Sequence, residues 1–133
     1  MKKFIALAIA VLMLATLAVP TFAKDVDVTY TVDEEYTVTI PDALTFGTED
    51  SVSVVGNVET AKVITVTGDF ELGECAYALV DAEGAAIEGA LLTSGTGATV
   101  NTVVTFNTAW VGEDNEGPAA AGTYTDTLTF TVA

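Results

Sequence analysis

The stretch "GTYTDTLTFTV", Gly122–Val132, decides the fold class of this chain. Threonine occupies every second position from Thr123 to Thr131, and the positions between them are Tyr124, Asp126, Leu128, Phe130 and Val132. Because successive side chains of a strand point to opposite faces of a sheet, this alternation predicts a β-strand with its apolar row buried and its threonines in water. Asp126 interrupts the apolar row. We expect its carboxylate to lie near the start of the strand and to accept hydrogen bonds from backbone N–H groups of the preceding turn.

The same period of two runs through most of the chain. It predicts strands over 26–32, 36–40, 61–72, 75–80 and 99–110, and a weaker strand over 51–55. Gly68 marks a bulge or bend, and the glycine-rich stretch 89–100 is interpreted as a loop with at most a short edge strand. No segment shows the periodicity of a helix. About seven short strands separated by Gly, Asn and Asp predict a two-sheet antiparallel β-sandwich.

The N-terminus carries the pattern of a secretory signal peptide. Residues 1–23 begin with two lysines, continue with an apolar run and end in "PTFA", which predicts cleavage after Ala23. The alternative is an uncleaved anchor helix, since the apolar run is long for a signal peptide. Cleavage leaves residues 24–133 as a single domain, secreted or associated with the cell surface. There is no Leu-Pro-x-Thr-Gly sorting motif, so we expect a partner or non-covalent contacts to retain the protein at a surface.

The charge of the exported part is strongly negative. All 19 acidic residues lie after Ala23, where only Lys24 and Lys62 oppose them, so residues 24–133 carry a net charge of −17. Such a chain is repelled by phosphate backbones and by anionic lipids. We therefore expect no nucleic-acid binding and no membrane insertion after signal cleavage.

Two segments resemble known exported domains. "PAAAGTYTDTLTFTV" (118–132) resembles the last strand of bacterial fimbrial and spore-coat-U-type domains, which reads Gly-x-Tyr-x-Asp before alternating Thr and apolar residues. "YTVTIPDALTFG" (36–47) and "VITVTGDFEL" (63–72) resemble small immunoglobulin-like surface domains of Gram-positive bacteria. The resemblance implies an immunoglobulin-like sandwich and a role in surface assembly or adhesion. The chain departs from chaperone–usher subunits in having a single cysteine, Cys75, and therefore no internal disulfide.

The residue types present argue against catalysis. The chain has no histidine, which excludes histidine-based triads and histidine-bearing metal sites. The three serines and Cys75 have no base beside them in the sequence, so we expect no enzyme activity. Cys75 is interpreted as a small buried residue of a strand, with an intermolecular disulfide or a reactive thiol as the alternative.

One acidic loop is a candidate cation site. The stretch "GEDNEG" presents four oxygen-bearing side chains, Glu113, Asp114, Asn115 and Glu116. Hard oxygen ligands suit Ca²⁺, although the spacing is not that of an EF-hand. The alternative is a solvated acidic loop, in which case the protein needs no cofactor. Trp110 stands beside this loop and is interpreted as a core or rim residue, with a glycan platform as the alternative.

Lys62 and Asp126 are a candidate pair. Each shares the parity of an apolar row, Lys62 with Ile64 and Val66, and Asp126 with Leu128 and Phe130. If both face inward, they form an ion pair or an isopeptide bond of the kind that locks some Gram-positive surface domains. The alternative is that both lie near strand ends and extend to water.

These observations predict a non-enzymatic structural or adhesion protein of the cell exterior. We expect it to act as a pilus-like or matrix subunit that associates with itself, or with other surface proteins, through exposed strand edges. The alternative is an extracellular binding module for a glycan or Ca²⁺.

Overall fold

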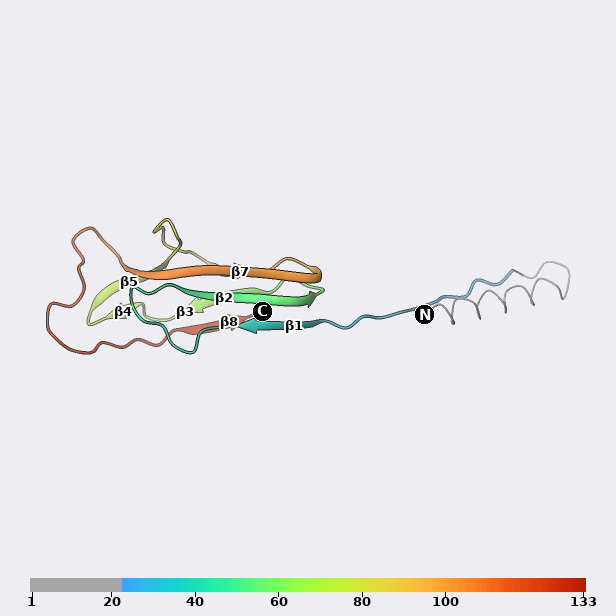
Figure 1. Cartoon of the computed structure of the whole chain (residues 1–133), viewed down its shortest axis with the longest axis horizontal. Coiled ribbons are helices and arrows are strands. Elements are labelled where there is room, and N and C mark those ends of the chain that lie inside the picture. The colour runs from blue at the N-terminus through green and yellow to red at the C-terminus, as the bar shows by residue number, and fades with distance from the viewer. Residues whose placement is uncertain (1–22) are drawn as a thin grey trace. The chain divides into compact units, whose positions relative to one another are not determined.

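The computed structural model describes residues 23–133, and these residues contain strands and no helix (Figure 1). The strands are β1 (Glu35–Thr39), β2 (Asp50–Val58), β3 (Val63–Thr67), β4 (Glu71–Leu72), β5 (Cys75–Val80), β6 (Ala90–Thr93), β7 (Gly97–Trp110) and β8 (Thr129–Val132). The chain divides into two units at Val32, and all eight strands belong to the second unit, Asp33–Ala133. The predicted signal peptide, residues 1–23, lies outside the described residues except for Ala23.

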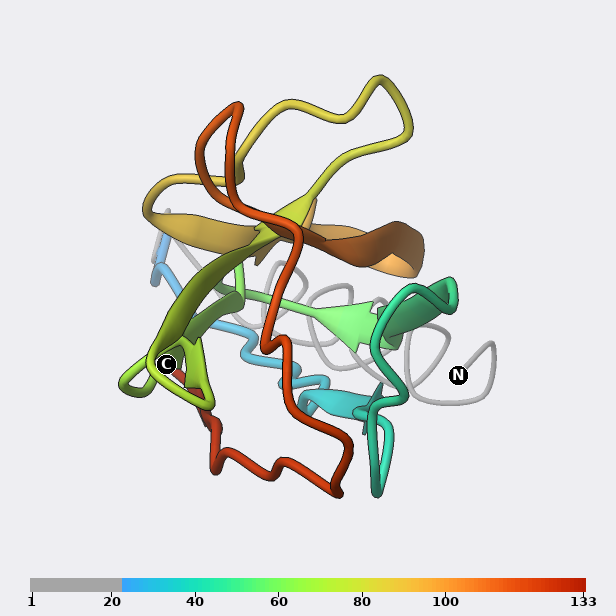
Figure 2. The same cartoon turned by 90° about the vertical axis from the view of Figure 1, so that its left-hand side faces the viewer.

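The strands form two antiparallel sheets, as the alternation predicts. The larger sheet has the order β1-β2-β7-β5-β4, and the smaller has the order β6-β3-β8. β7 is the central strand of the larger sheet, because its first part pairs with β2 and its last part with β5. The connection after β7 carries the chain across one end of the molecule to β8 in the other sheet (Figure 2).

The core lies between the two sheets. Its fully buried side chains come from strands of both: Val52, Val54 and Val58 from β2, Ile64 from β3, Leu92 from β6 and Phe106 from β7. Val52 and Val54 occupy alternate positions of β2, as expected for one buried face. This shared cluster makes the two sheets the layers of one β-sandwich.

Two short connections follow local rules. Leu72 pairs with Cys75, so Gly73 and Glu74 form a two-residue hairpin loop, and both have the positive φ that such loops require. Gly68 lies at a bend directly after β3, as predicted. The glycine-rich stretch 89–100 contains the expected short edge strand, β6, but its last four residues belong to the long strand β7, so the expectation of a loop with at most an edge strand was only partly right.

Gly56 permits the close approach of β1 and β2 in the larger sheet. It lies opposite Tyr36 in the β1–β2 register and has a φ of 139°. A Cβ atom at this position would collide with the backbone of Glu35 and Tyr36. Only glycine therefore lets β1 lie in its observed position along β2.

Three predicted strands differ from the structure. The strand predicted over 61–72 is divided into β3 of the smaller sheet and β4 of the larger sheet. Residues 26–32 form no strand, and their apolar side chains are exposed. The predicted strand 122–132 is shortened to β8, Thr129–Val132, and Tyr124 and Val132 of its apolar row are 37% and 39% exposed. Alternation alone cannot predict where a strand is absent or shortened, because a strand also needs a neighbour that pairs with its backbone.

Candidate functional site

The larger sheet has an open edge at β1, and the smaller sheet has an open edge at β8. Within residues 23–133, β1 pairs only with β2 and β8 only with β3. The register places Phe130 opposite Val66 and Val132 opposite Ile64, so the apolar row of β8 faces the core side. Ile64 is completely buried, whereas Val132 remains 39% exposed. The sandwich therefore covers its core incompletely beside β8.

The ladder of β8 shows which backbone groups face outward. Val63 and Ala133 exchange two N–H···O bonds of 2.9 Å each. In an antiparallel pair such hydrogen-bonded positions alternate with non-hydrogen-bonded ones, so Val132 and Phe130 occupy the latter. Their N–H and C=O groups point away from β3, toward the open side, and can pair with a further strand.

A groove of about 420 Å³ continues this gap. One wall comes from the chain after β1, with Pro41, Leu44 and Phe46, and the other from the chain that enters β8, with Tyr124, Leu128 and Phe130. Tyr77 and Thr108 also line the groove, together with the carboxylates Asp42 and Asp126. The groove thus joins an apolar lining to two negative charges.

Asp126 is held at the side of this groove by β5. Its Oδ2 accepts a 2.8 Å hydrogen bond from the Tyr77 hydroxyl, and its Oδ1 accepts one of 2.7 Å from the Thr127 N–H. The tyrosine hydrogen bond lowers the pKa of Asp126, and backbone N–H groups of Thr127, Glu71 and Phe70 act in the same direction. Burial raises the pKa of Tyr77, and the neighbouring carboxylate raises it further.

An aromatic cluster supports the same end of the molecule. The rings of Phe46 and Trp110 stack with their centroids 4.2 Å apart, and the edge of Tyr77 meets Phe46 at 6.0 Å. Gly117 lies against the indole, and a Cβ atom there would collide with it. Trp110 is half-buried in this packing, in agreement with the prediction of a core or rim residue.

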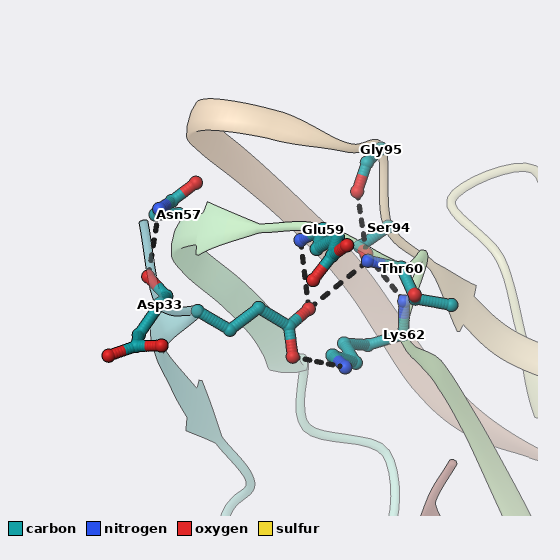
Figure 3. Close-up of polar contacts among 8 residues, drawn as sticks. Asp33, Asn57, Glu59, Thr60, Lys62, Ser94 and Gly95 are labelled. Carbon is teal, nitrogen blue, oxygen red and sulfur yellow. Dashed lines mark hydrogen bonds and ion pairs between the residues drawn. The ribbon is translucent and has the colours of Figure 1, made fainter. Parts of the chain in front are cut away.

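A second polar cluster fixes the start of β1. Glu34 Oε1 accepts hydrogen bonds from the N–H groups of Glu59 at 2.8 Å and Thr60 at 3.1 Å, and its Oε2 accepts one of 3.0 Å from Lys62 Nζ. Beside it, Asn57 donates a 3.1 Å hydrogen bond to the carbonyl of Asp33 (Figure 3). These hydrogen bonds hold Asp33 and Glu34 against the β2–β3 connection, directly before the first residue of β1.

Lys62 is well enclosed in this cluster. Its side chain is 13% exposed, and Nζ also lies 4.7 Å from the centre of the Tyr36 ring. The hydrogen bond to Glu34 raises the pKa of Lys62 and lowers that of Glu34. The backbone N–H of Lys62 donates to Ser94 Oγ, whose hydroxyl donates in turn to the Gly95 carbonyl (Figure 3).

The structure gives Lys62 and Asp126 different partners. Lys62 pairs with Glu34 and Asp126 with Tyr77, and no hydrogen bond or ion pair joins the two residues. The isopeptide bond stays a prediction that an intact mass measurement tests, because the bond would lower the mass of the chain by one water. Alternation placed both side chains in apolar rows, but it could not indicate which nearby polar group each would meet.

The acidic loop 112–117 is organised by Asn115. Its Nδ2 donates to the carbonyls of Ala76 and Val111, and its Oδ1 accepts from the Gly117 N–H. Glu113, Asp114 and Glu116 are exposed. Residues 23–133 contain no group of three or more Asp, Glu or Cys side chains arranged to hold a metal ion, and the Ca²⁺ site at this loop stays a prediction.

The segment before β1 presents an uncovered apolar row. Val26, Val28, Tyr30 and Val32 are between 63% and 85% exposed. We call residues 24–32 the N-terminal arm.

Cys75, a free cysteine, is half-buried at the start of β5.

No protein-family model, curated protein or solved structure matches this chain. Across residues 23–133 no helix is long and apolar enough to cross a membrane. The arguments about function therefore rest on the open edges, the groove and the polar clusters.

Proposed function

We propose that this chain is an exported structural protein of the cell exterior, with an immunoglobulin-like sandwich, that associates through its open sheet edges. The observation that carries the proposal is the edge of β8, whose inward row stays partly exposed and whose alternate backbone groups point to the open side. Such an edge is a template for the addition of a further strand. An adhesive, pilus-like or matrix role follows from self-association outside the cell.

Two features of the sequence agree with this role. The signal-peptide pattern of residues 1–23 indicates export, and the charge of −17 keeps single copies apart until a specific contact forms. The polar side chains of the site serve packing and hydrogen bonding, because Asp126 and Lys62 each have a structural partner. We therefore propose that the protein is not an enzyme.

The test combines localisation with the mass of the particle in solution. We expect the mature chain, residues 24–133, in the culture medium or the cell-surface fraction of the producing cell. We expect the purified mature chain to form dimers or larger species with rising concentration, as measured by sedimentation equilibrium. A chain that stays monomeric at all concentrations and salt levels contradicts the assembly role.

A second candidate is an extracellular glycan-binding module, and the groove beside Asp126 favours it. Tyr124 and Phe46 offer apolar surfaces there, and Asp126 and Asp42 offer hydrogen-bond acceptors. The test is a titration with a panel of neutral glycans, followed by the fluorescence of Trp110, which stacks on the groove residue Phe46. A change in Trp110 fluorescence on addition of a glycan supports this candidate if the Asp126→Ala variant no longer shows it.

A further inference from the structure

The groove beside β8 carries two carboxylates and, among the residues that line it, no positive charge. Asp42 and Asp126 line it, whereas none of its lining residues is a lysine or an arginine. Residues 24–133 contain two lysines: Lys62 is bound to Glu34 at the start of β1, and Lys24 belongs to the first unit of the chain, Met1–Val32. The two negative charges of the groove are therefore left for a positively charged ligand to neutralise.

Asp126 is fixed in place before any ligand arrives. Its Oδ2 is held by the hydroxyl of Tyr77, which is 6% exposed, and its Oδ1 by the N–H of Thr127. The hydrogen bond from Tyr77 also lowers the pKa of Asp126, so the carboxylate is ionised at neutral pH. A charge that is already oriented loses little conformational freedom when a ligand binds to it.

The aromatic side chains of the groove are also held in position. Phe46 is 36% exposed, and its ring stacks on Trp110. Tyr124 is 37% exposed, its hydroxyl donates a 2.6 Å hydrogen bond to the Ala120 carbonyl, and its ring lies directly against Gly73. Aromatic rings attract an ammonium group through their faces and bury the apolar part of a ligand.

We infer that the groove binds a small organic amine, with its ammonium group paired with Asp126 and Asp42 and its apolar body against Phe46 and Tyr124. The volume of about 420 Å³ is within the range of small-molecule sites. A neutral ligand of the same shape would shield the two carboxylates from water without supplying a counter-charge. The inference does not rest on self-association, and it differs from the glycan candidate because the ligand is positively charged.

The main experiment compares an amine with a neutral molecule of nearly the same shape. The isotopically labelled mature chain is titrated with phenethylammonium and with phenethyl alcohol, and amide NMR spectra follow binding. We expect phenethylammonium to shift the amide signals of residues 41–46 and 124–130 and to bind at least about fivefold more tightly than the alcohol. Ethylammonium, which lacks the apolar body, should bind more weakly than phenethylammonium.

Three variants with the same loss of charge locate the site. Asp42→Asn removes an exposed carboxylate of the groove, and Asp126→Asn removes the other while its amide oxygen can still accept from Tyr77. Glu83→Gln is the matched control, because Glu83 is exposed in the β5–β6 connection and does not line the groove. We expect each aspartate variant to bind phenethylammonium at least about threefold more weakly, and the control to bind it as the unsubstituted chain does.

The possible results separate this inference from the proposed function. Equal binding of phenethylammonium and phenethyl alcohol would make the groove an apolar site and overturn the inference. An equal effect of Glu83→Gln and the aspartate variants would mean that the overall charge of −17, and not the groove, attracts the amine. The absence of any shift at the groove amides overturns the inference as well. A strictly monomeric chain that binds the amine leaves this inference standing and contradicts only the assembly role.

Discussion

The hydroxyl of Tyr77 donates a 2.8 Å hydrogen bond to Asp126 Oδ2 across 49 positions of the sequence. Tyr77 is 6% exposed and lies in β5 of the larger sheet, whereas Asp126 lies on the segment that enters β8 of the smaller sheet. The hydrogen bond therefore fastens one sheet to the end of the other. It also places the carboxylate at the side of the groove, where it contributes negative charge.

Removal of this hydroxyl should destabilise the sandwich. Tyr77→Phe keeps the ring, which packs against Phe46 and Phe70, and deletes only the donor. Since Asp126 keeps its backbone hydrogen bond to Thr127 and some contact with water, we expect a loss of about 1 kcal/mol in the free energy of unfolding. Urea unfolding of the mature chain, followed by the fluorescence of Trp110, measures it.

Asp126→Asn is the matched control for that experiment. The amide oxygen can still accept a hydrogen bond from Tyr77, but the negative charge is gone. The variant therefore separates the contribution of the hydrogen bond from that of the carboxylate charge. We expect it to be less destabilising than Asp126→Ala. Equal stability of the Tyr77→Phe variant and the unsubstituted chain would mean that the hydrogen bond makes no net contribution to folding.

Acid should weaken the fold through Asp126 and Glu34. Both carboxyls have folded-state pKa values below their ordinary values of 3.8 and 4.5, through hydrogen bonds from Tyr77 and Lys62 respectively. A lowered pKa means that the folded state binds protons less readily than the unfolded state, so the contribution is present above the unfolded pKa. It is lost as the pH falls through the folded pKa.

The measurement is the urea midpoint as a function of pH. We expect it to decline as the pH is lowered below about 4.5, the ordinary value for glutamate. The Asp126→Asn variant should show a shallower decline, because one of the two carboxyls no longer titrates. A decline of the same steepness in both proteins would assign the acid sensitivity to other carboxyls.

Lys62 has the opposite linkage. Its hydrogen bond to Glu34 raises the pKa of the amine above 10.5, so its contribution is present at neutral pH and is lost as the pH rises through the folded pKa. Lys62→Met keeps much of the side-chain volume and removes the charge. We expect the unfolding midpoint of this variant to change less between neutral pH and pH 11 than that of the unsubstituted chain, measured by circular dichroism.

Alternation in the sequence predicted the β-sandwich and much of its core. Ile64, which alternation assigned to an apolar row, is buried, and Val66 and Phe130 of such rows pack against the core. It was wrong for residues 26–32 and overestimated the last strand, because period two reports that a segment is suited to a sheet, not that a neighbour is present to pair with it. The second of these differences falls beside the open edge of β8.

The partners of the candidate site residues could not be predicted in the same way. The Lys62–Glu34 pair depends on the bend at residues 59–60, which places Lys62 beside the start of β1. The Tyr77–Asp126 pair depends on the long connection after β7, whose path no periodicity determines. For both Lys62 and Asp126 the sequence suggested a charge that faces inward, but the fold determined which residue pairs with it.

Gly56 should be the least replaceable glycine of the larger sheet. Gly56→Ala combines a φ of 139° with a collision against the backbone of Glu35 and Tyr36, so β1 must move away from β2. We expect a loss of about 2 kcal/mol or more in the free energy of unfolding.

Gly47→Ala is the control for this position. Gly47 also has a positive φ, 78°, but a Cβ atom there meets no other atom within 4 Å. This variant therefore pays only the conformational cost, about 1 kcal/mol. Similar losses in the two variants would show that strand contact at Gly56 adds nothing beyond the backbone conformation.

Salt should strengthen the proposed self-association. Each mature copy carries a net charge of −17, and the groove beside the open edge of β8 is lined by the carboxylates Asp42 and Asp126. From about 10 mM to about 1 M NaCl the Debye length falls from about 30 Å to about 3 Å, so repulsion between copies is progressively screened. Sedimentation equilibrium across this range should show association that becomes tighter with salt. Association that weakens with salt would indicate that attraction between opposite charges, and not contact between apolar side chains, holds the copies together.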